Sequence, residues 1–298
     1  MSSDPDVLRR RPPEQALRWA AAAIGRGSRI ASVRRLSEGG WHANHALAIV
    51  DRGGATHRVV LRRWARPEWV IEDPEFTAAH EAAVLELLAR TPIPVPRLVA
   101  ADPDGAACGV PALLITRLPG RAPGLPADMG AFLEQLARAL PAIHAVDAGG
   151  RLPPYRRYYE LGSRTPPAWS RRPRLWERAV ELARAEPPPG RRCFIHRDYH
   201  PENTLWSRGR LTGIVDWTSA CWGPPAVDTG HMRWNLAVTY GIDAADEFLR
   251  LAPERFDNQP YWDLVTVLDL GPELDPREWP RFDLDRIERY VASVLERA

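Results

Sequence analysis

The order of apolar and polar residues divides the chain into a strand-rich first part and a helix-rich remainder. Residues 14–25 have a helical composition and end at a glycine. Residues 32–50 and 57–64 show the alternating, β-branched pattern of strands, and the turn DRGGAT between them predicts a hairpin. A helix is predicted after Pro74, followed by proline-restricted extended chain in TPIPVPRLV and a buried strand in GVPALLITRL.

Helical spacing dominates the chain after residue 120. Helices are predicted in DMGAFLEQLARALPAIHAV, RLWERAVELARAE, VDTGHMRWNLAV, AADEFLRLA, YWDLVTVLDL and DLDRIERYVASVLERA, and a short hairpin in TLWSRGRLTGIVDW. No internal repeat is visible. The pattern predicts a small strand-rich N-terminal part, a connector near 116–120 and a larger helical C-terminal part.

The composition is typical of a folded protein, with 45% hydrophobic and 26% charged residues in 298. No segment approaches the roughly 18 uninterrupted apolar residues of a membrane helix, so we expect a cytoplasmic protein with no membrane partner. The three cysteines are scattered, which favours reduced core thiols over a disulfide framework or a zinc site.

The basic residues are all arginine, because the sequence contains no lysine. Residues 241–298 carry fourteen Asp and Glu against seven Arg, a net of −7, within a chain of net charge +2. These acids are expected either to form solvated helix faces or to line a pocket for a cationic acceptor. No basic run is interleaved with stacking aromatics, so no nucleic-acid partner is expected.

Residues 194–206, FIHRDYHPENTLW, hold the candidate chemistry. His196, Arg197, Asp198 and Asn203 fit the spacing H-R-D-x-x-x-x-N of kinase catalytic loops. In that pattern a carboxylate orients the attacking hydroxyl, and an amide oxygen a short turn later ligates magnesium. A predicted hairpin then leads to Asp216, a second carboxylate that we expect to meet the same metal.

The segments FIHRDYHPENTLW and GIVDWTSACWGPPAVDTG resemble the signature of the aminoglycoside phosphotransferase family, which shares the protein-kinase fold with choline kinases. The likeness is specific over residues 194–230 and weaker but collinear from about 30 to 145. It implies an α+β, two-lobed fold: a nucleotide-binding lobe with a five-stranded antiparallel sheet (1–115), a hinge (116–120) and a mainly helical catalytic and acceptor-binding lobe (121–298).

The resemblance implies a role for each matching residue of the second lobe. Asp198 would be the catalytic base that orients the acceptor hydroxyl. Asn203 and Asp216 would be the Mg²⁺ ligands, and His196 and Asp228 would support the catalytic loop. The reaction implied is transfer of the γ-phosphoryl group of ATP or GTP to a hydroxyl. Trp217 follows Asp216 where protein kinases have Phe-Gly, and no A-P-E follows, so a small-molecule acceptor is expected.

The resemblance also implies how the first lobe holds the nucleotide. The turn Ser-Glu-Gly-Gly would cover the phosphates, where Gly39 and Gly40 allow backbone N–H groups to approach. Asn44 would belong to the same loop. Arg62 stands where V-A-I-K has its lysine, since V-V-L-R matches in register, and Glu81 would pair with it. An ordinary solvated strand arginine is the alternative for Arg62.

The implied adenine site lies within LLITRLPG. The carbonyl of Thr116 and the amide of Leu118 would bond the base, and Ile115 would face it from behind.

Two other functions remain open from the residues. His196, Asp198 and His200 could ligate a hydrolytic metal, because alternate residues of a strand point to one face. That interpretation leaves Asn203 and Asp216 unexplained. A catalytically inactive kinase-like protein that binds a nucleotide or a partner is the other alternative, favoured by the arginine at position 62.

Overall fold

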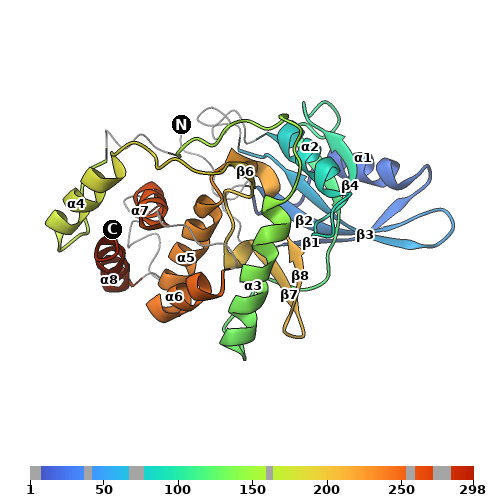
Figure 1. Ribbon diagram of the computed structural model, residues 1–298. Helices are drawn as coiled ribbons and strands as arrows, with labels where there is room; N and C mark the ends of the chain where they lie inside the picture. Colours follow the sequence, from blue (N-terminus) through green and yellow to red (C-terminus); the bar gives the residue numbers. More distant parts are fainter. Residues whose placement is uncertain (1–7, 37–41, 67–76, 159–163, 253–258, 271–282) are drawn as a thin grey trace. The chain divides into compact units, whose positions relative to one another are not determined.

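The computed structural model describes residues 8–36, 42–66, 77–158, 164–252, 259–270 and 283–298. The chain divides into two compact units (Figure 1). The first unit contains residues 1–119 together with 213–219, and the second contains 120–212 together with 220–298. Each is described by itself below. The predicted lobe boundaries at 115 and 120, and the hinge between them, stay predictions.

A five-stranded antiparallel sheet forms the first unit, in the order β1-β2-β3-β5-β4. Its strands are β1 (Arg29–Arg35), β2 (Ala43–Val50), β3 (Thr56–Arg63), β4 (Leu98–Asp102) and β5 (Ala112–Thr116). β2 and β3 pair without a bulge from Ala43–Arg63 to Val50–Thr56, as the predicted hairpin requires. The five-stranded sheet expected from the sequence is therefore present.

The two helices of this unit contact opposite faces of the sheet. Helix α1 (Glu14–Ile24) shares a buried cluster with Leu47, Leu61 and Leu114. Helix α2 (Ala78–Leu88) begins at the capping side chain of Thr77, which accepts a hydrogen bond from the backbone N–H of His80. Neighbouring residues of a strand point to opposite faces of the sheet. The side chain of Leu61 therefore points toward α1, and that of Arg62 points to the other face, where it contacts Glu81 of α2.

The second unit is mainly helical. Its helices are α3 (Met129–His144), α4 (Pro173–Ala183), α5 (Ala226–Tyr240), α6 (Ile242–Leu251), α7 (Gln259–Leu270) and α8 (Leu284–Leu295). Helix α5 packs against α6, α7 and α8 and is buried on nearly every side. A helix surrounded in this way needs no polar face, so α5 can carry functional side chains in a dry environment.

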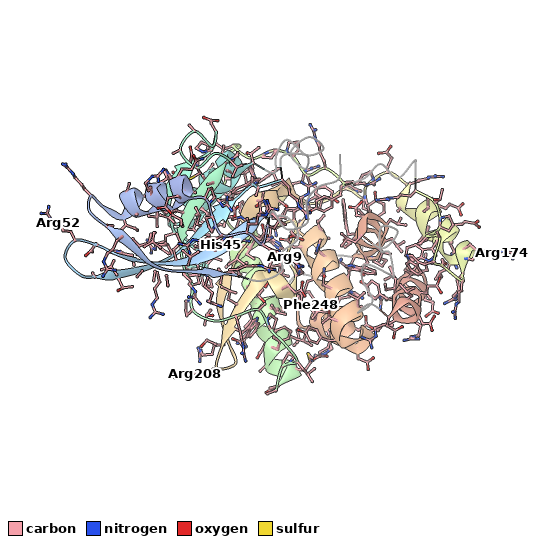
Figure 2. The ribbon with its side chains drawn as sticks, turned by 180° about the vertical axis from the view of Figure 1, so that it is seen from behind. Arg9, His45, Arg52, Arg174, Arg208 and Phe248 are labelled. Atoms are coloured by element: carbon pink, nitrogen blue, oxygen red, sulfur yellow. The ribbon has the colours of Figure 1, made fainter. Side chains whose placement is uncertain are left out.

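Two short sheets carry the predicted catalytic segments. β6 (Cys193–Ile195) pairs with β9 (Cys221–Gly223), and β7 (Thr204–Ser207) pairs with β8 (Arg210–Ile214). The β7–β8 hairpin was predicted, whereas the three-residue β6–β9 ladder was not. Figure 2 labels Arg52 and Arg208, in the turns of the two hairpins, and Arg174 on α4.

The α+β organisation predicted from the sequence, a five-stranded sheet in the first part and a mainly helical second part, is confirmed, with all six helices predicted after residue 120 present. Among the described residues, no helix combines the length and the apolar character that crossing a membrane requires.

Candidate active site

Arg62 is the centre of a buried polar cluster in the first unit. Its Nε donates to Oε2 of Glu81 at 2.7 Å, and its Nη2 donates to Oγ1 of Thr218 at 2.8 Å and to Oδ1 of Asp216. Thr218 in turn donates to Oε2 of Glu81 at 3.0 Å. Arg62 and Glu81 are both at least 95% buried, which excludes a solvated strand arginine.

This cluster places two carboxylates around one guanidinium. Burial acts first to raise the pKa of Glu81, Arg62 opposes that effect, and the charge of Asp216 reinforces it, so the pKa of Glu81 lies above its ordinary value. Burial acts to lower the pKa of Arg62, but Asp216 and Glu81 outweigh it and raise that pKa. The guanidinium therefore stays charged and is held from two sides.

Two of the residues predicted to hold a nucleotide, Asn44 and Ile115, share the face of the sheet that carries Arg62. Asn44 of β2 lies directly opposite Arg62, and Ile115 of β5 lies opposite Val60, two residues before Arg62. Residues directly opposite in a ladder point to the same face. Oδ1 of Asn44 is buried and accepts no hydrogen bond within the described chain.

A histidine and a tryptophan adjoin this cluster. The guanidinium of Arg62 lies 5.3 Å from the ring of Trp64, and the His42 ring meets Trp64 edge to face at 4.6 Å. Burial, and then the charge of Arg62, lower the pKa of His42 to about 3, against a smaller opposing effect of Asp216. His42 is therefore neutral at physiological pH and adds no charge beside Arg62.

Asp198 of the second unit is held at both carboxylate oxygens. The Nδ2 of Asn203 donates to Oδ2 of Asp198, and also to its backbone oxygen, each at 2.9 Å. Nε2 of His231 lies 3.0 Å from Oδ1, and Nε2 of His200 lies 3.7 Å from it. Burial acts to raise the pKa of Asp198, but the histidines outweigh it and lower that pKa well below its usual value. Asp198 is thus ionised.

Asp228 supports the loop that carries Asp198. It is fully buried in the first turn of α5 and accepts from the backbone N–H groups of His196 at 3.0 Å and Arg197 at 2.7 Å. The ring Nε2 of His144 lies 3.0 Å from it. Arg197 has a φ of 69°, in the left-handed region that costs a non-glycine residue free energy. The carboxylate therefore holds a strained turn directly before Asp198.

The structure locates the predicted residues within the two units. Arg62, Glu81 and Asp216 are brought together in the first unit, and Asp198, Asn203, His196 and Asp228 in the second. Gly39 and Gly40 lie outside the described residues. Thr116 ends β5, where its backbone N–H bonds the carbonyl of Arg97, and Leu118 follows that strand.

Sequence analysis did not predict four residues that lie against the predicted site residues: His42, His144, Thr218 and His231. A signal existed for His231, because it stands three residues after Asp228 and so shares a helix face with it. Thr218 is 156 residues from Arg62 in the sequence, so no local spacing pattern predicts their contact. The position of His42 likewise depends on tertiary packing.

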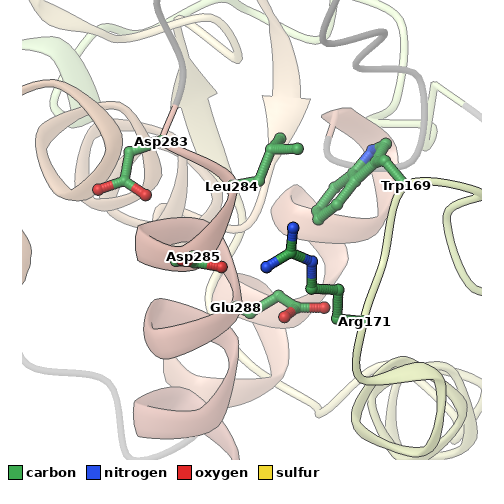
Figure 3. Close-up of a pocket in the computed structure, with 6 residues that line it drawn as sticks. All are labelled: Trp169, Arg171, Asp283, Leu284, Asp285 and Glu288. Carbon is green, nitrogen blue, oxygen red and sulfur yellow. The ribbon is translucent and has the colours of Figure 1, made fainter.

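Two of the described acids near the C-terminus pair with a buried arginine. Asp263 pairs with buried Arg233 at 3.3 Å, and Asp246 pairs with the same arginine at 2.9 Å. A cavity of about 240 Å³ is lined by Trp169, Arg171, Asp283, Leu284, Asp285 and Glu288 (Figure 3). The Ser170 hydroxyl donates to Glu288 at 2.6 Å, and Arg171 lines the same cavity. The lining therefore does not consist of acids alone, as a pocket for a cationic acceptor would favour.

The structure does not support the alternative in which His196, Asp198 and His200 ligate a hydrolytic metal. Within the described parts of the chain, no three His, Cys, Asp or Glu side chains gather as a metal site. The short Asp198–histidine contacts instead belong to a carboxylate held by hydrogen bonds.

A sequence model described as the phosphotransferase enzyme family (APH) matches residues 48–258, more than two thirds of the chain. The chain belongs to this phosphotransferase family. The match includes β3, α2, the Asp198 loop and Asp216, so both clusters described above lie inside the family region. No curated protein sequence matches this phosphotransferase-family chain significantly.

Solved structures of phosphotransferases have the same fold. Aminoglycoside phosphotransferase APH(4)-Ia, in a ternary complex with AMP-PNP and hygromycin B, aligns at a TM-score of 0.64 and 18% identity, covering 90% of this chain and 94% of its own. A macrolide 2'-phosphotransferase type I gives 0.58 and 20%, covering 94% and 95%. Macrolide 2'-phosphotransferase MphH from Brachybacterium faecium gives 0.53 and 18%, covering 95% and 98%.

Proposed function

We propose that this phosphotransferase-family protein transfers the γ-phosphoryl group of ATP, or of GTP, to a hydroxyl of a small molecule. The observation that supports this most is the state of Asp198: an ionised carboxylate whose two oxygens are positioned by Asn203 and His231. Such a group can orient an acceptor hydroxyl and accept its hydrogen bond. The complex of APH(4)-Ia with AMP-PNP makes an adenine nucleotide the first donor to test.

Asp198 acts on the acceptor in this proposal. Its depressed pKa makes it a weak base, so its main contribution is to align the attacking oxygen and to take the proton as the bond to phosphorus forms. Asn203 and His231 restrict rotation of the carboxylate, while Asp228 fixes the loop beneath it.

Arg62 acts on the donor. We assign it the phosphate-binding position that a lysine holds in other kinases, with Glu81 and Thr218 fixing its orientation. A guanidinium is planar, always charged and able to contact phosphate through two N–H groups. The shared face of Asn44, Arg62 and Ile115 supports a nucleotide site on this side of the sheet.

The donor set fits Mg²⁺. Asn203 uses its amide nitrogen on Asp198, which leaves Oδ1 without a partner in the described chain and available as a hard oxygen ligand. We propose Asn203 and Asp216 as the protein ligands. When bound, the ion would neutralise charge on the nucleotide phosphates.

Nucleotide binding can be tested without knowing the acceptor. Thermal unfolding would be followed with ATP and GTP, with and without Mg²⁺, for the wild type, Asp216→Asn and the exposed control Asp147→Asn. A ligand that binds only the folded state raises the melting temperature. We expect a Mg²⁺-dependent rise for the wild type and the control, and its loss in Asp216→Asn. No rise with either nucleotide would contradict the proposal.

Transfer is then measured with a panel of hydroxyl-bearing acceptors that begins with aminoglycosides and macrolides, the substrates named for the similar structures. Asp198→Asn should keep nucleotide binding and lose transfer. Transfer at the wild-type rate in that variant would remove Asp198 from the reaction. Nucleotide binding without transfer to any acceptor would favour the inactive, binding-only alternative.

A further inference from the structure

A second cavity lies within the helical unit, with a volume of about 520 Å³. This volume is in the range of small-molecule pockets. One wall is the proline- and arginine-rich segment 187–192. The others are Tyr155 and Arg157, the chain entering α5 at Pro224–Ala226, and Trp262 of α7.

The β6–β9 ladder separates this cavity from Asp198. Arg192 directly precedes Cys193, and Pro224 directly follows Gly223, and these two strand ends are paired with each other. The catalytic loop leaves the other end of β6, after Ile195, which pairs with Cys221. Two residues of strand span roughly 7 Å, so the cavity and the loop begin at opposite ends of the ladder. Tyr155 of the cavity wall is shared with the loop, since its ring lies 5.8 Å from the guanidinium of Arg197.

The charged residues that line the cavity are all cations: Arg157, Arg191 and Arg192. Arg157 is oriented by the hydroxyl of Tyr261, to which it donates, and by the carbonyl of Ala183 at 3.4 Å. No described carboxylate forms an ion pair with Arg157 or Arg192. Arg157 and Arg192 thus bring to the cavity positive charge that no described carboxylate pairs with.

One buried acid that interacts with Arg157 compensates its charge only weakly. Asp269 does not line the cavity, but the charge of Arg157 acts on its carboxyl group. Burial raises the pKa of Asp269 to about 7, against smaller opposing effects of the Tyr158 amide and nearby arginines. Near neutral pH, Asp269 therefore carries less than a full negative charge.

Aromatic and proline side chains form much of the remaining lining. The rings of Tyr155 and Trp262 meet edge to face at 5.9 Å, and three consecutive prolines line the same cavity. The first turn of α5 also lines the cavity at Ala226, but its buried carboxylate, Asp228, offsets the positive end of that helix. The arginines and the aromatic walls together suit an anion attached to a planar body.

We propose that this cavity is a small-molecule binding site distinct from the phosphotransfer site. Its ligand carries a carboxylate or phosphate group, contacted by the arginines, on a flat apolar body held against Tyr155 and the prolines. The site is independent of whether the protein transfers phosphate.

Titration calorimetry with 2-naphthoate, 2-naphthyl phosphate and the neutral 2-naphthamide tests this proposal. We expect saturable binding of at least one anion. The amide should bind at least about tenfold more weakly, because it lacks the charge that the arginines recognise. Saturating ATP and Mg²⁺ should not displace the anion, because the cavity and the Asp198 loop begin at opposite ends of the β6–β9 ladder. Displacement by ATP would assign the anion to the phosphotransfer site and overturn the proposal.

The variant Arg191→Gln/Arg192→Gln changes two exposed side chains and should fold normally. It is expected to weaken binding of the anion about tenfold or more. The control Arg174→Gln/Arg178→Gln removes the same charge from the exposed face of α4 and should bind as the wild type does. Equal loss in both variants, an unchanged affinity in the first, or no saturable binding at millimolar ligand would each overturn the proposal.

Discussion

Asp228 provides the sharpest test of how this protein holds the loop that carries Asp198. Its carboxylate is fully buried and is the partner of two backbone N–H groups, those of His196 and Arg197, and of the His144 ring. The substitution Asp228→Ala removes the acceptor and leaves these donors buried. Water cannot easily replace it, because the surrounding residues of α5 are buried as well.

The expected loss of stability follows from the two backbone donors. A buried donor left without an acceptor costs about 1–3 kcal/mol, so two of them predict a loss of about 4 kcal/mol in the free energy of unfolding. The loss of the carboxylate also releases the left-handed turn at Arg197. Asp228→Asn keeps one acceptor oxygen and should lose about half as much.

Urea unfolding followed by circular dichroism measures these differences directly. The matched control is Asp147→Ala, which removes a carboxylate that accepts one exposed backbone N–H from Gly149 at 2.9 Å. That variant should lose less than about 1 kcal/mol. If Asp228→Ala lost no more than the control, Asp228 would not be the support of the loop that carries Asp198.

Three further substitutions test other contacts. His231→Ala should lower kcat about tenfold to hundredfold without weakening nucleotide binding, since one hydrogen bond to Asp198 is lost, and His231→Gln should recover part of it; unchanged kcat in both would contradict this role. The wild type should lose at most about 4 kcal/mol of stability between about pH 4 and about pH 7, because the carboxyl of Asp269 ionises in the unfolded chain while it keeps its proton in the folded one. Asp269→Asn should abolish this loss; if denaturant unfolding at several pH values showed the same fall in stability in the variant, the assignment would be wrong. Gly120→Ala should cost about 2 kcal/mol, because φ is 101° and a Cβ would lie 2.6 Å from Oγ1 of Thr212; an unchanged melting temperature would contradict it.

Most of the fold was predictable because its elements carry local signals. The β2–β3 hairpin was visible from alternation around a glycine turn, and α1 and α8 from helical composition and spacing. The β6–β9 ladder was not visible, because three-residue strands are too short for a periodic pattern and form only when distant segments meet.

The candidate site was predictable to a similar degree. Asp198, Asn203 and Asp216 stand in motifs with fixed spacing, so sequence alone selects them. The surroundings of Asp198 are different: the hydrogen bond from His231 depends on how α5 packs beside the loop. The buried position of Arg62 likewise depends on Glu81 of α2 and Thr218, which are 19 and 156 residues away in the sequence.

The arginine at position 62 has a practical consequence for chemical labelling. Reagents that acylate amines, including acyl-phosphate derivatives of nucleotides, detect kinases by modifying a lysine beside the bound phosphates. This sequence contains no lysine, and Arg62 occupies the corresponding strand position. A guanidinium that stays protonated is a poor nucleophile toward such reagents. If the protein binds ATP as proposed, surveys of nucleotide-binding proteins that depend on lysine labelling would therefore pass over this chain.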